Sequence, residues 1–180
     1  MSQKKNLLQA NIDALDDGLA LLALLQPEHY TRGCQPAFRS TIGAHFRHVL
    51  EHYRCFIAQL DAVHISYDSR QRDQLLESDF AYVNQTLIEL KGVLGDLQVH
   101  DLDRACQLSD QQTDKPVAST LFRELLFLQV HTMHHYAIIG AMTRTFGLQP
   151  ADDFGVAIAT RANQKVIAES TAGDSLPCAR

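Results

Sequence analysis

The stretch ELLFLQVHTMHHYAIIGAM, residues 124–142, decides the fold because it is long, apolar and helical in its spacing. Its apolar positions recur at steps of three and four residues, as they do on the buried side of an α-helix. Gly147 and Pro150 follow, and both residue types commonly end a helix. We therefore expect a helix over residues 118–147. Its apolar stripe consists of Leu121, Leu125, Leu128, Ile138 and Met142.

Three more segments show helical spacing, at residues 3–25, 37–62 and 76–97. No alternating strand pattern competes with them. Long helices with apolar stripes bury those stripes against one another. The sequence therefore predicts an all-α fold, an antiparallel four-helix bundle.

The remaining segments are expected to be additions to a single domain. Apolar and polar residues alternate in DRACQLS (103–109) and DKPVAS (114–119), which predicts a small β-hairpin between the third and fourth helices. Residues 152–180 are expected to form a C-terminal extension with one short helix or an extended arm. We thus expect one domain over residues 1–180, with a core over residues 3–147.

Composition excludes several classes of protein. The chain has 180 residues, of which 46% are hydrophobic, and a net charge of −5 with histidine neutral. An acidic chain without a basic block is not suited to a phosphate backbone, so we expect no nucleic-acid partner. We see no signal-peptide pattern and no apolar run of about 18 residues, so we expect a cytoplasmic protein without a membrane span. The four cysteines are widely spaced and are expected to be free thiols.

The histidines form two groups, each in the middle of a predicted helix. HTMHHY contains His131, His134 and His135. Positions i and i+4 lie about 40° apart on a helix, so His131 and His135 project together. Both fall on the apolar stripe, so we expect them to point into the interior of the bundle.

The second group lies in AHFRHVLEHY, which contains His45, His48 and His52. His45 and His52 share a face with the apolar residues of this helix. His48 lies to one side of that face and pairs with His52 at i+4. Helix geometry alone therefore favours His52 or His45 as the inward residue.

Burying several imidazoles is costly unless each ring nitrogen has a partner. A single buried histidine is usually satisfied by a backbone carbonyl or a water, but two inward groups favour a shared metal ion. Imidazole ligands suit zinc, nickel, iron or copper rather than magnesium or calcium. The chain lacks the paired Glu-x-x-His pattern of di-iron bundles. Three histidines would leave coordination positions open, as in catalytic sites.

The chain resembles the DinB-like, or YfiT-like, superfamily of metal-dependent four-helix-bundle proteins. The resemblance lies in STIGAHFRHVLEHY (40–53), ISYDSRQRDQLLESD (65–79) and the 124–142 stretch. It implies that the metal ligands are His48, His131 and His135. Helix geometry keeps His52 or His45 open as alternatives to His48. The resemblance also implies zinc or nickel before iron, a small-molecule or low-molecular-weight thiol substrate, and a homodimer.

Two functions follow as hypotheses. One is a metal-dependent thiol transferase or hydrolase that acts on a small molecule. The alternative is a non-catalytic dimeric module for binding or stress response, with the same fold.

Other residues near the site carry open alternatives. Arg70 or Arg72 would either bind an anionic substrate or form ion pairs that dock the third helix. Glu51 would either hold an imidazole in place or lie exposed. Cys55 would either approach the metal or act as a small buried residue.

Overall fold

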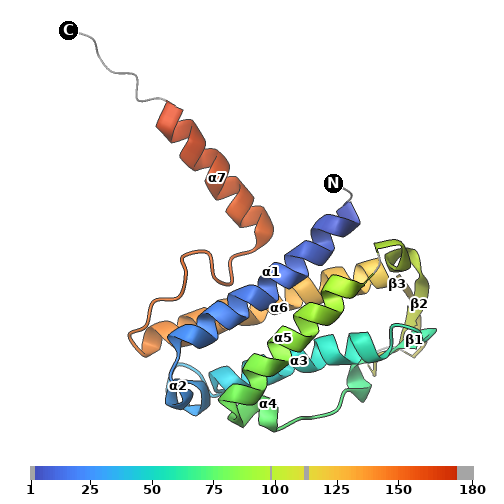
Figure 1. Ribbon diagram of the computed structural model, residues 1–180, viewed down its shortest axis with the longest axis horizontal. Helices are drawn as coiled ribbons and strands as arrows, with labels where there is room; N and C mark the ends of the chain where they lie inside the picture. Colours follow the sequence, from blue (N-terminus) through green and yellow to red (C-terminus); the bar gives the residue numbers. More distant parts are fainter. Residues whose placement is uncertain (1–2, 98, 112–113, 174–180) are drawn as a thin grey trace.

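The computed structural model describes residues 3–97, 99–111 and 114–173. The prediction of a mainly helical fold is confirmed, and a small sheet lies at one end of the helical body (Figure 1). Short 3₁₀ turns occur at η1 (Tyr67–Ser69) and η2 (Val99–Asp103). The α-helices are α1 (Gln3–Leu24), α2 (Pro27–Thr31), α3 (Ile42–Ala58), α4 (Leu75–Ser78), α5 (Phe80–Asp96), α6 (Leu121–Thr145) and α7 (Ile158–Gly173).

Threonine caps set the starts of the two helices that carry the histidines. The Thr41 hydroxyl accepts a hydrogen bond from the backbone N–H of Ala44 at 3.0 Å, at the start of α3. Thr120 accepts from the N–H of Arg123 at 3.2 Å, at the start of α6. Each cap satisfies a backbone donor that the first turn leaves free. Both helices therefore begin a few residues later than their apolar spacing predicts.

The third predicted helix, 76–97, is interrupted at Asp79. Its carboxylate accepts hydrogen bonds from the N–H groups of Ala81 and Tyr82, each at 3.0 Å, and so caps α5. Asp79 is extended, at φ −104° and ψ 105°, so the chain turns between α4 and α5. A short polar side chain that competes for backbone donors favours such a break over a continuous helix.

The four long helices α1, α3, α5 and α6 pack around a shared core. Helix α1 contacts α5 and α6, while α3 contacts α5 and α6 from the other side. In Figure 1, α1 and α6 run in one direction, and α3 and α5 run in the other. The contacts α1–α5 and α3–α6 are therefore antiparallel, as expected, whereas α1–α6 and α3–α5 join helices of the same direction. The core contains large side chains without solvent exposure, including Leu15, Phe46, Phe56, Leu87 and Leu125.

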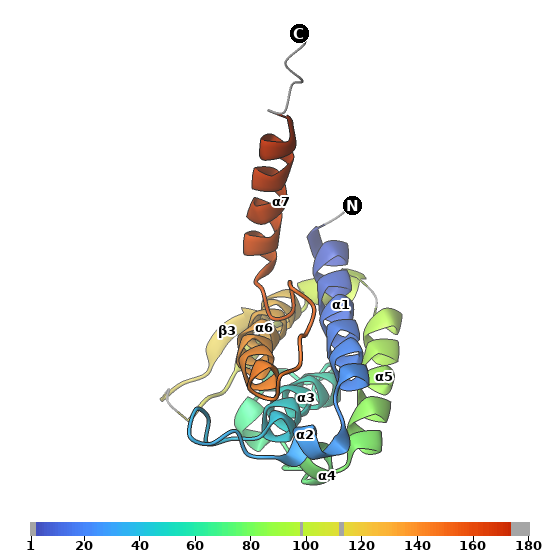
Figure 2. The ribbon, with the colours of Figure 1, turned by 90° about the vertical axis from the view of Figure 1, so that its left-hand side faces the viewer.

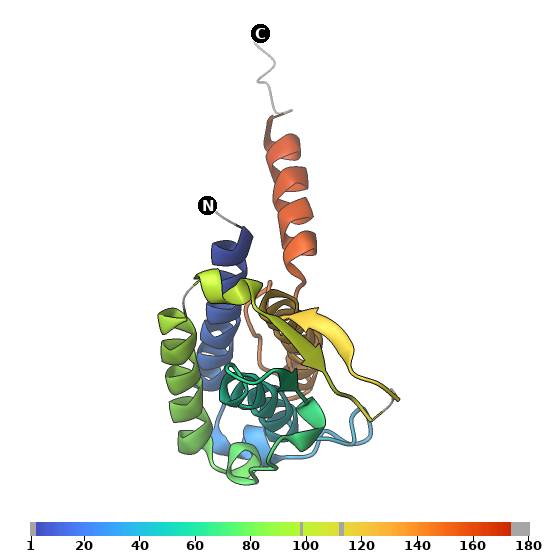
Figure 3. The ribbon, with the colours of Figure 1, turned by 90° about the vertical axis from the view of Figure 1, so that its right-hand side faces the viewer.

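The predicted hairpin is present as β2 (Ala105–Leu108) and β3 (Val117–Thr120), which are antiparallel with Cys106 opposite Ser119. A two-residue strand, β1 (His64–Ile65), pairs with β2 in parallel and was not expected. It is too short to show alternation in the sequence. The sheet lies where α3 ends and α6 begins (Figures 1 and 3).

The C-terminal extension contains a helix, α7, that projects away from the helical body (Figures 1 and 2). The segment before it is held on α6, where the Phe154 ring stacks on Tyr136 with centroids 4.8 Å apart. Arg161 fixes the first turn of α7 through ion pairs with Asp17 at 3.0 Å and Asp153 at 3.2 Å. Beyond this turn, Val166 is 64% exposed.

The state of the cysteines and the character of the helices bear on the class of protein. Cys34, Cys55 and Cys106 are buried free thiols, as predicted, and Cys178 lies outside the described residues. Among the helices that the structure describes, none combines the length and the apolar character that crossing a membrane requires.

Candidate metal centre

The two histidine groups meet on the flank of the contact between α3 and α6. Helix α6 turns Leu128, Thr132 and Tyr136 into the core, all without solvent exposure. His131 and His135 lie beside this row and are half-buried. The expectation that they point into the interior is therefore wrong. The core-facing side of α6 is rotated about the helix axis by part of a turn from the side that carries the two histidines. The same rotation explains why His48, at the edge of its own apolar face, lies opposite them.

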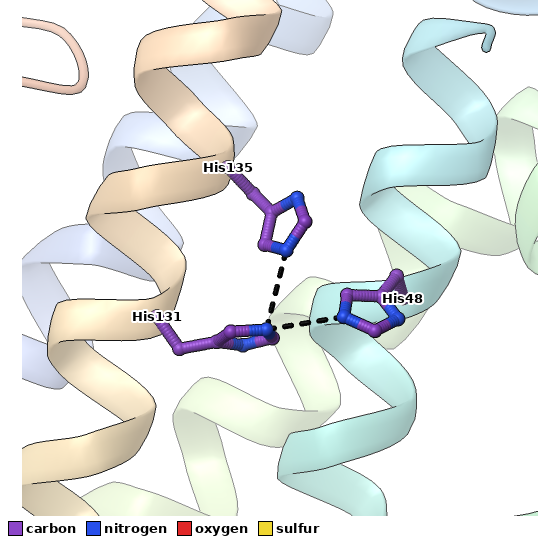
Figure 4. Close-up of side chains that lie close together, drawn as sticks. All are labelled: His48, His131 and His135. Carbon is purple, nitrogen blue, oxygen red and sulfur yellow. Dashed lines mark hydrogen bonds between the residues drawn. The ribbon is translucent and has the colours of Figure 1, made fainter.

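His48, His131 and His135 converge with their ring nitrogens (Figure 4). The Nε2 atoms of His48 and His131 lie 3.1 Å apart, and those of His131 and His135 lie 3.2 Å apart. Each ring offers one nitrogen to a group whose members all lie within 4.8 Å of one another. The structure thus brings together the three residues that the resemblance implies as ligands.

These contacts are not a self-sufficient hydrogen-bond network. Each nitrogen of a neutral imidazole carries either one hydrogen or one lone pair in the ring plane. His131 Nε2 can form one well-directed hydrogen bond, yet it contacts two other Nε2 atoms. A cation that accepts three lone pairs would satisfy all three nitrogens.

The spacing of the nitrogens also suits a metal ion. Zinc binds imidazole nitrogen at about 2.0–2.1 Å in tetrahedral geometry, which places two ligand nitrogens about 3.3–3.4 Å apart. The two observed separations, 3.1 and 3.2 Å, are close to this value. Two of the three pairs therefore have the spacing of ligands on a zinc-sized divalent cation, and the third pair lies within 4.8 Å.

The imidazoles are in the protonation state that metal binding requires. Burial, together with neighbouring histidines, lowers the pKa of His48 and of His131 to about 3. The same causes lower the pKa of His135 to about 4. All three rings are therefore neutral near pH 7, with lone pairs available to a metal.

His45 and His52, the alternatives to His48, lie at the two ends of the group. His45 Nδ1 lies 2.9 Å from His135 Nδ1, on the side of His135 away from the other rings. His52 Nδ1 donates to the backbone carbonyl of His48 at 2.6 Å. Neither belongs to the converging group. His45 is placed to fix the ring orientation of His135, a role that the sequence pattern did not indicate.

Aromatic rings cover one end of the histidine group. Phe127 stacks on His131, with centroids 5.3 Å apart and an interplanar angle of 21°. Tyr67 stacks on His52 at 5.4 Å and 28°. Sequence reasoning missed both rings, although Phe127 precedes His131 by one helical turn and Tyr67 lies in the conspicuous 65–79 segment. They exclude water from this end of the group.

Glu51 neither contacts an imidazole nor lies exposed, the two alternatives that the sequence suggested. It is 2% exposed, and its Oε1 accepts a hydrogen bond from the N–H of Asp73 at 2.9 Å. The guanidinium groups of Arg47 and Arg70 approach it at 3.8 and 3.6 Å. Because a buried carboxylate needs charged partners, Glu51 is held by these arginines rather than by an imidazole.

Cys55 behaves as a small buried residue. Its thiol donates to the carbonyl of Ser66 at 3.2 Å. Burial raises the pKa of the Cys55 thiol, so the group is protonated at neutral pH. A protonated, buried thiol is neither a good metal ligand nor a nucleophile.

Comparison with protein-family models matches the DinB family over residues 1–165. Because this match covers most of the chain, the protein belongs to the DinB family. A search of curated proteins finds no match.

Proposed function

We propose that this DinB-family protein binds one divalent transition metal ion through His48, His131 and His135, with zinc or nickel preferred to iron. The observation that carries the proposal is the double contact of His131 Nε2, at 3.1 Å to His48 and 3.2 Å to His135. Three nitrogens that all offer lone pairs repel one another when no cation lies between them. The same three nitrogens are favourable ligands when they surround a cation. The packing of α1, α3, α5 and α6 is consistent with the four-helix bundle implied by the family resemblance.

We further propose that the activity is a metal-dependent thiol transfer or hydrolysis on a small molecule. A bound metal would supply a Lewis acid that lowers the pKa of a coordinated water or thiol. The chain contributes neutral imidazoles that are half-buried, so one side of the group stays accessible. Phe127 and Tyr67 shield the other side, where they stack on His131 and His52.

Metal analysis of the full chain, purified without a histidine tag, tests the metal site. After reconstitution with zinc or nickel we expect about one ion per chain in the wild type and none in His131→Ala. His134→Ala is the matched control because His134 is exposed, neighbours the group and lies outside it. Equal metal content in His131→Ala and the wild type would refute the proposed ligands.

A second candidate, a non-catalytic dimeric binding module, is favoured by a groove of about 850 Å³ between α1, α6 and the first turn of α7. Exposed apolar side chains continue from it along α6, with Leu126 44% and Val130 58% exposed. Helix α7 extends from the same groove and carries exposed apolar side chains, with Val166 64% and Ile167 53% exposed. A two-fold pairing in which each α7 lies in the partner's groove would cover both surfaces at once.

Sedimentation of the full chain tests this pairing. We expect a homodimer for the wild type and a monomer for Val166→Asp. Val93→Asp is the control, because Val93 is an exposed residue of α5 on another surface. A monomeric wild type, or a dimer that Val166→Asp leaves intact, would exclude this interface.

A further inference from the structure

A cavity of about 570 Å³ lies between the part of α3 that follows His48 and the segment that follows β1. The α3 side of the cavity is formed by Arg54, Cys55 and Gln59, among others. The opposite side is formed by residues 69–73. A volume of this size is enough for a small molecule or for one end of it.

Two side chains of α3 hold the segment over the cavity. The Gln59 amide accepts from the N–H of Ser66 at 2.9 Å and donates to the Ser66 carbonyl at 3.3 Å. Two turns earlier, Glu51 accepts from the N–H of Asp73 at 2.9 Å. Both ends of the segment are therefore fixed to one rigid helix, and the cavity is built into the fold.

The charges of the cavity are unbalanced. Three guanidinium groups, from Arg54, Arg70 and Arg72, face two carboxylates, from Glu51 and Asp73. The Asp73 carboxylate is committed to Arg54 at 2.7 Å, and Glu51 lies between Arg47 and Arg70.

Arg72 is the remaining guanidinium. It is exposed at the rim of the cavity and forms no ion pair with any residue that the structure describes. The cavity is thus a positive site on a chain whose net charge is −5. An arginine without a protein partner at a cavity rim is suited to a carboxylate or a phosphate, which it can bind through two parallel hydrogen bonds.

The cavity borders the face of α3 that carries His48 and His52. His48, His52, Cys55 and Gln59 follow one another at steps of four, three and four residues and so share a face. The guanidinium of Arg70 lies 3.6 Å from the carboxylate of Glu51, the residue that precedes His52 on α3. The positive charge of the cavity is therefore next to the turn of α3 that follows His48. With a rise of 1.5 Å per residue, Cys55 lies about 10 Å beyond His48 along the helix axis.

We propose that this cavity binds the anionic end, a carboxylate or a phosphate, of an elongated small-molecule substrate. Arg72 is the main contact and Arg70 a fixed second positive charge, so that the other end of the molecule extends along α3 toward His48. As the subsite for a substrate, the assignment rests on the proposed function. As an anion-binding cavity, it rests only on the residues that line it. Arg72 positions the substrate and takes no part in bond making.

Titration of the full chain with inorganic phosphate and, separately, with acetate tests the cavity, with binding followed by calorimetry at constant ionic strength. We expect Arg72→Gln to weaken binding about tenfold or more, because a charge-assisted bidentate contact is lost. Arg72→Lys should recover part of the affinity. Arg39→Gln is the matched control, because Arg39 is also exposed and has no ion pair with the described residues. It should bind as the wild type does.

A further arm, His131→Ala, separates this inference from the metal site. If phosphate and acetate bind this variant as tightly as the wild type, the cavity binds anions independently of any metal. If His131→Ala abolishes binding while Arg72→Gln retains it, the anion binds at the histidines and the inference is overturned. Equal effects of Arg72→Gln and Arg39→Gln, or no binding of either anion by the wild type, would overturn it as well.

Discussion

Two polar groups lie side by side where α3 meets α6, a core group of Asn11, Tyr53 and Thr132 and a flank group of His48, His131 and His135. They differ in whether their own members satisfy their hydrogen-bonding atoms. In the core, Tyr53 donates to Asn11 Oδ1 at 2.8 Å, and Asn11 Nδ2 donates to the carbonyl of Leu7 at 2.9 Å. Thr132 donates to the carbonyl of Leu128 at 2.7 Å and lies 3.3 Å from the Tyr53 hydroxyl. Every side chain of this group has a protein partner.

The histidine group on the flank is the opposite case. His131 Nε2 has two neighbouring ring nitrogens, and only one of the two contacts can be a hydrogen bond directed along the hydrogen or lone pair of that atom. A closed polar network stabilises a fold, whereas an incomplete one is retained where something else completes it. The comparison supports a structural role for the core group, and it supports the ligand role that we propose for the flank group.

Removing one imidazole should break the flank group and leave the core group intact. We expect His135→Ala to lower zinc affinity more than about a hundredfold, beyond the roughly 10–100-fold typical of changes outside the coordination shell. Competition with a chromogenic chelator measures the affinity. Thr132→Val is the control, since Thr132 lies in the core group on the same helix. A Thr132→Val protein that lost zinc to the same extent would contradict the division between the two groups.

Removing a member of the core group should have the reverse effect. Asn11→Ala leaves the Tyr53 hydroxyl without its acceptor, so we expect the free energy of unfolding to fall by about 1–3 kcal/mol. Urea denaturation of the metal-free protein measures this change. Zinc content should remain that of the wild type. Loss of zinc from the folded variant would show that the two groups are coupled.

His45 provides a finer test of the flank group. When His135 binds a metal through Nε2, its Nδ1 carries the hydrogen and donates it to His45 Nδ1, which lies 2.9 Å away. We expect His45→Ala to weaken zinc binding about tenfold, and His45→Gln, which retains an acceptor, to restore part of the affinity. Unchanged affinity in His45→Ala would remove His45 from the site.

The smallest expected difference between the two groups is in how the free energy of unfolding depends on pH. The pKa values of His48 and His131 are lowered to about 3 and that of His135 to about 4 in the folded chain, while unfolded histidines titrate near 6.5. The unfolded state therefore binds more protons between these values, and the metal-free protein should lose stability as pH falls from about 6.5 toward 4. Denaturation midpoints of His131→Ala should depend less on pH over this range, whereas those of Asn11→Ala should keep the wild-type slope.

The sequence predicts the long helices well, because burial of one face imposes a regular spacing of three and four residues. It does not predict the break at Asp79, where a local side-chain cap replaces helical hydrogen bonds. Nor does it predict that α1 and α6 run in the same direction, since this depends on connections without a periodic pattern. The strand β1 is held by its pairing with β2, which lies about 40 residues later in the chain.

The histidine site was accessible from the sequence only in part. The i, i+4 spacing brings His131 and His135 together, but the apolar stripe of α3 favoured His52 or His45 over His48. Only the family resemblance implies His48, and its position in the structure has a physical reason. The two helices meet flank to flank at this level, because Thr132 and Tyr136, rather than the histidines, occupy the core side of α6.

The histidine site joins parts of the chain that are far apart, since His48 and His131 are separated by 83 positions. During translation, α3 emerges from the ribosome long before α6, and the early chain holds only one of the two halves. The site therefore forms only once α6 has docked on α3. A metal ion that bound these histidines would bind only the folded chain. Its binding free energy would therefore stabilise the docked position of α6 against unfolding.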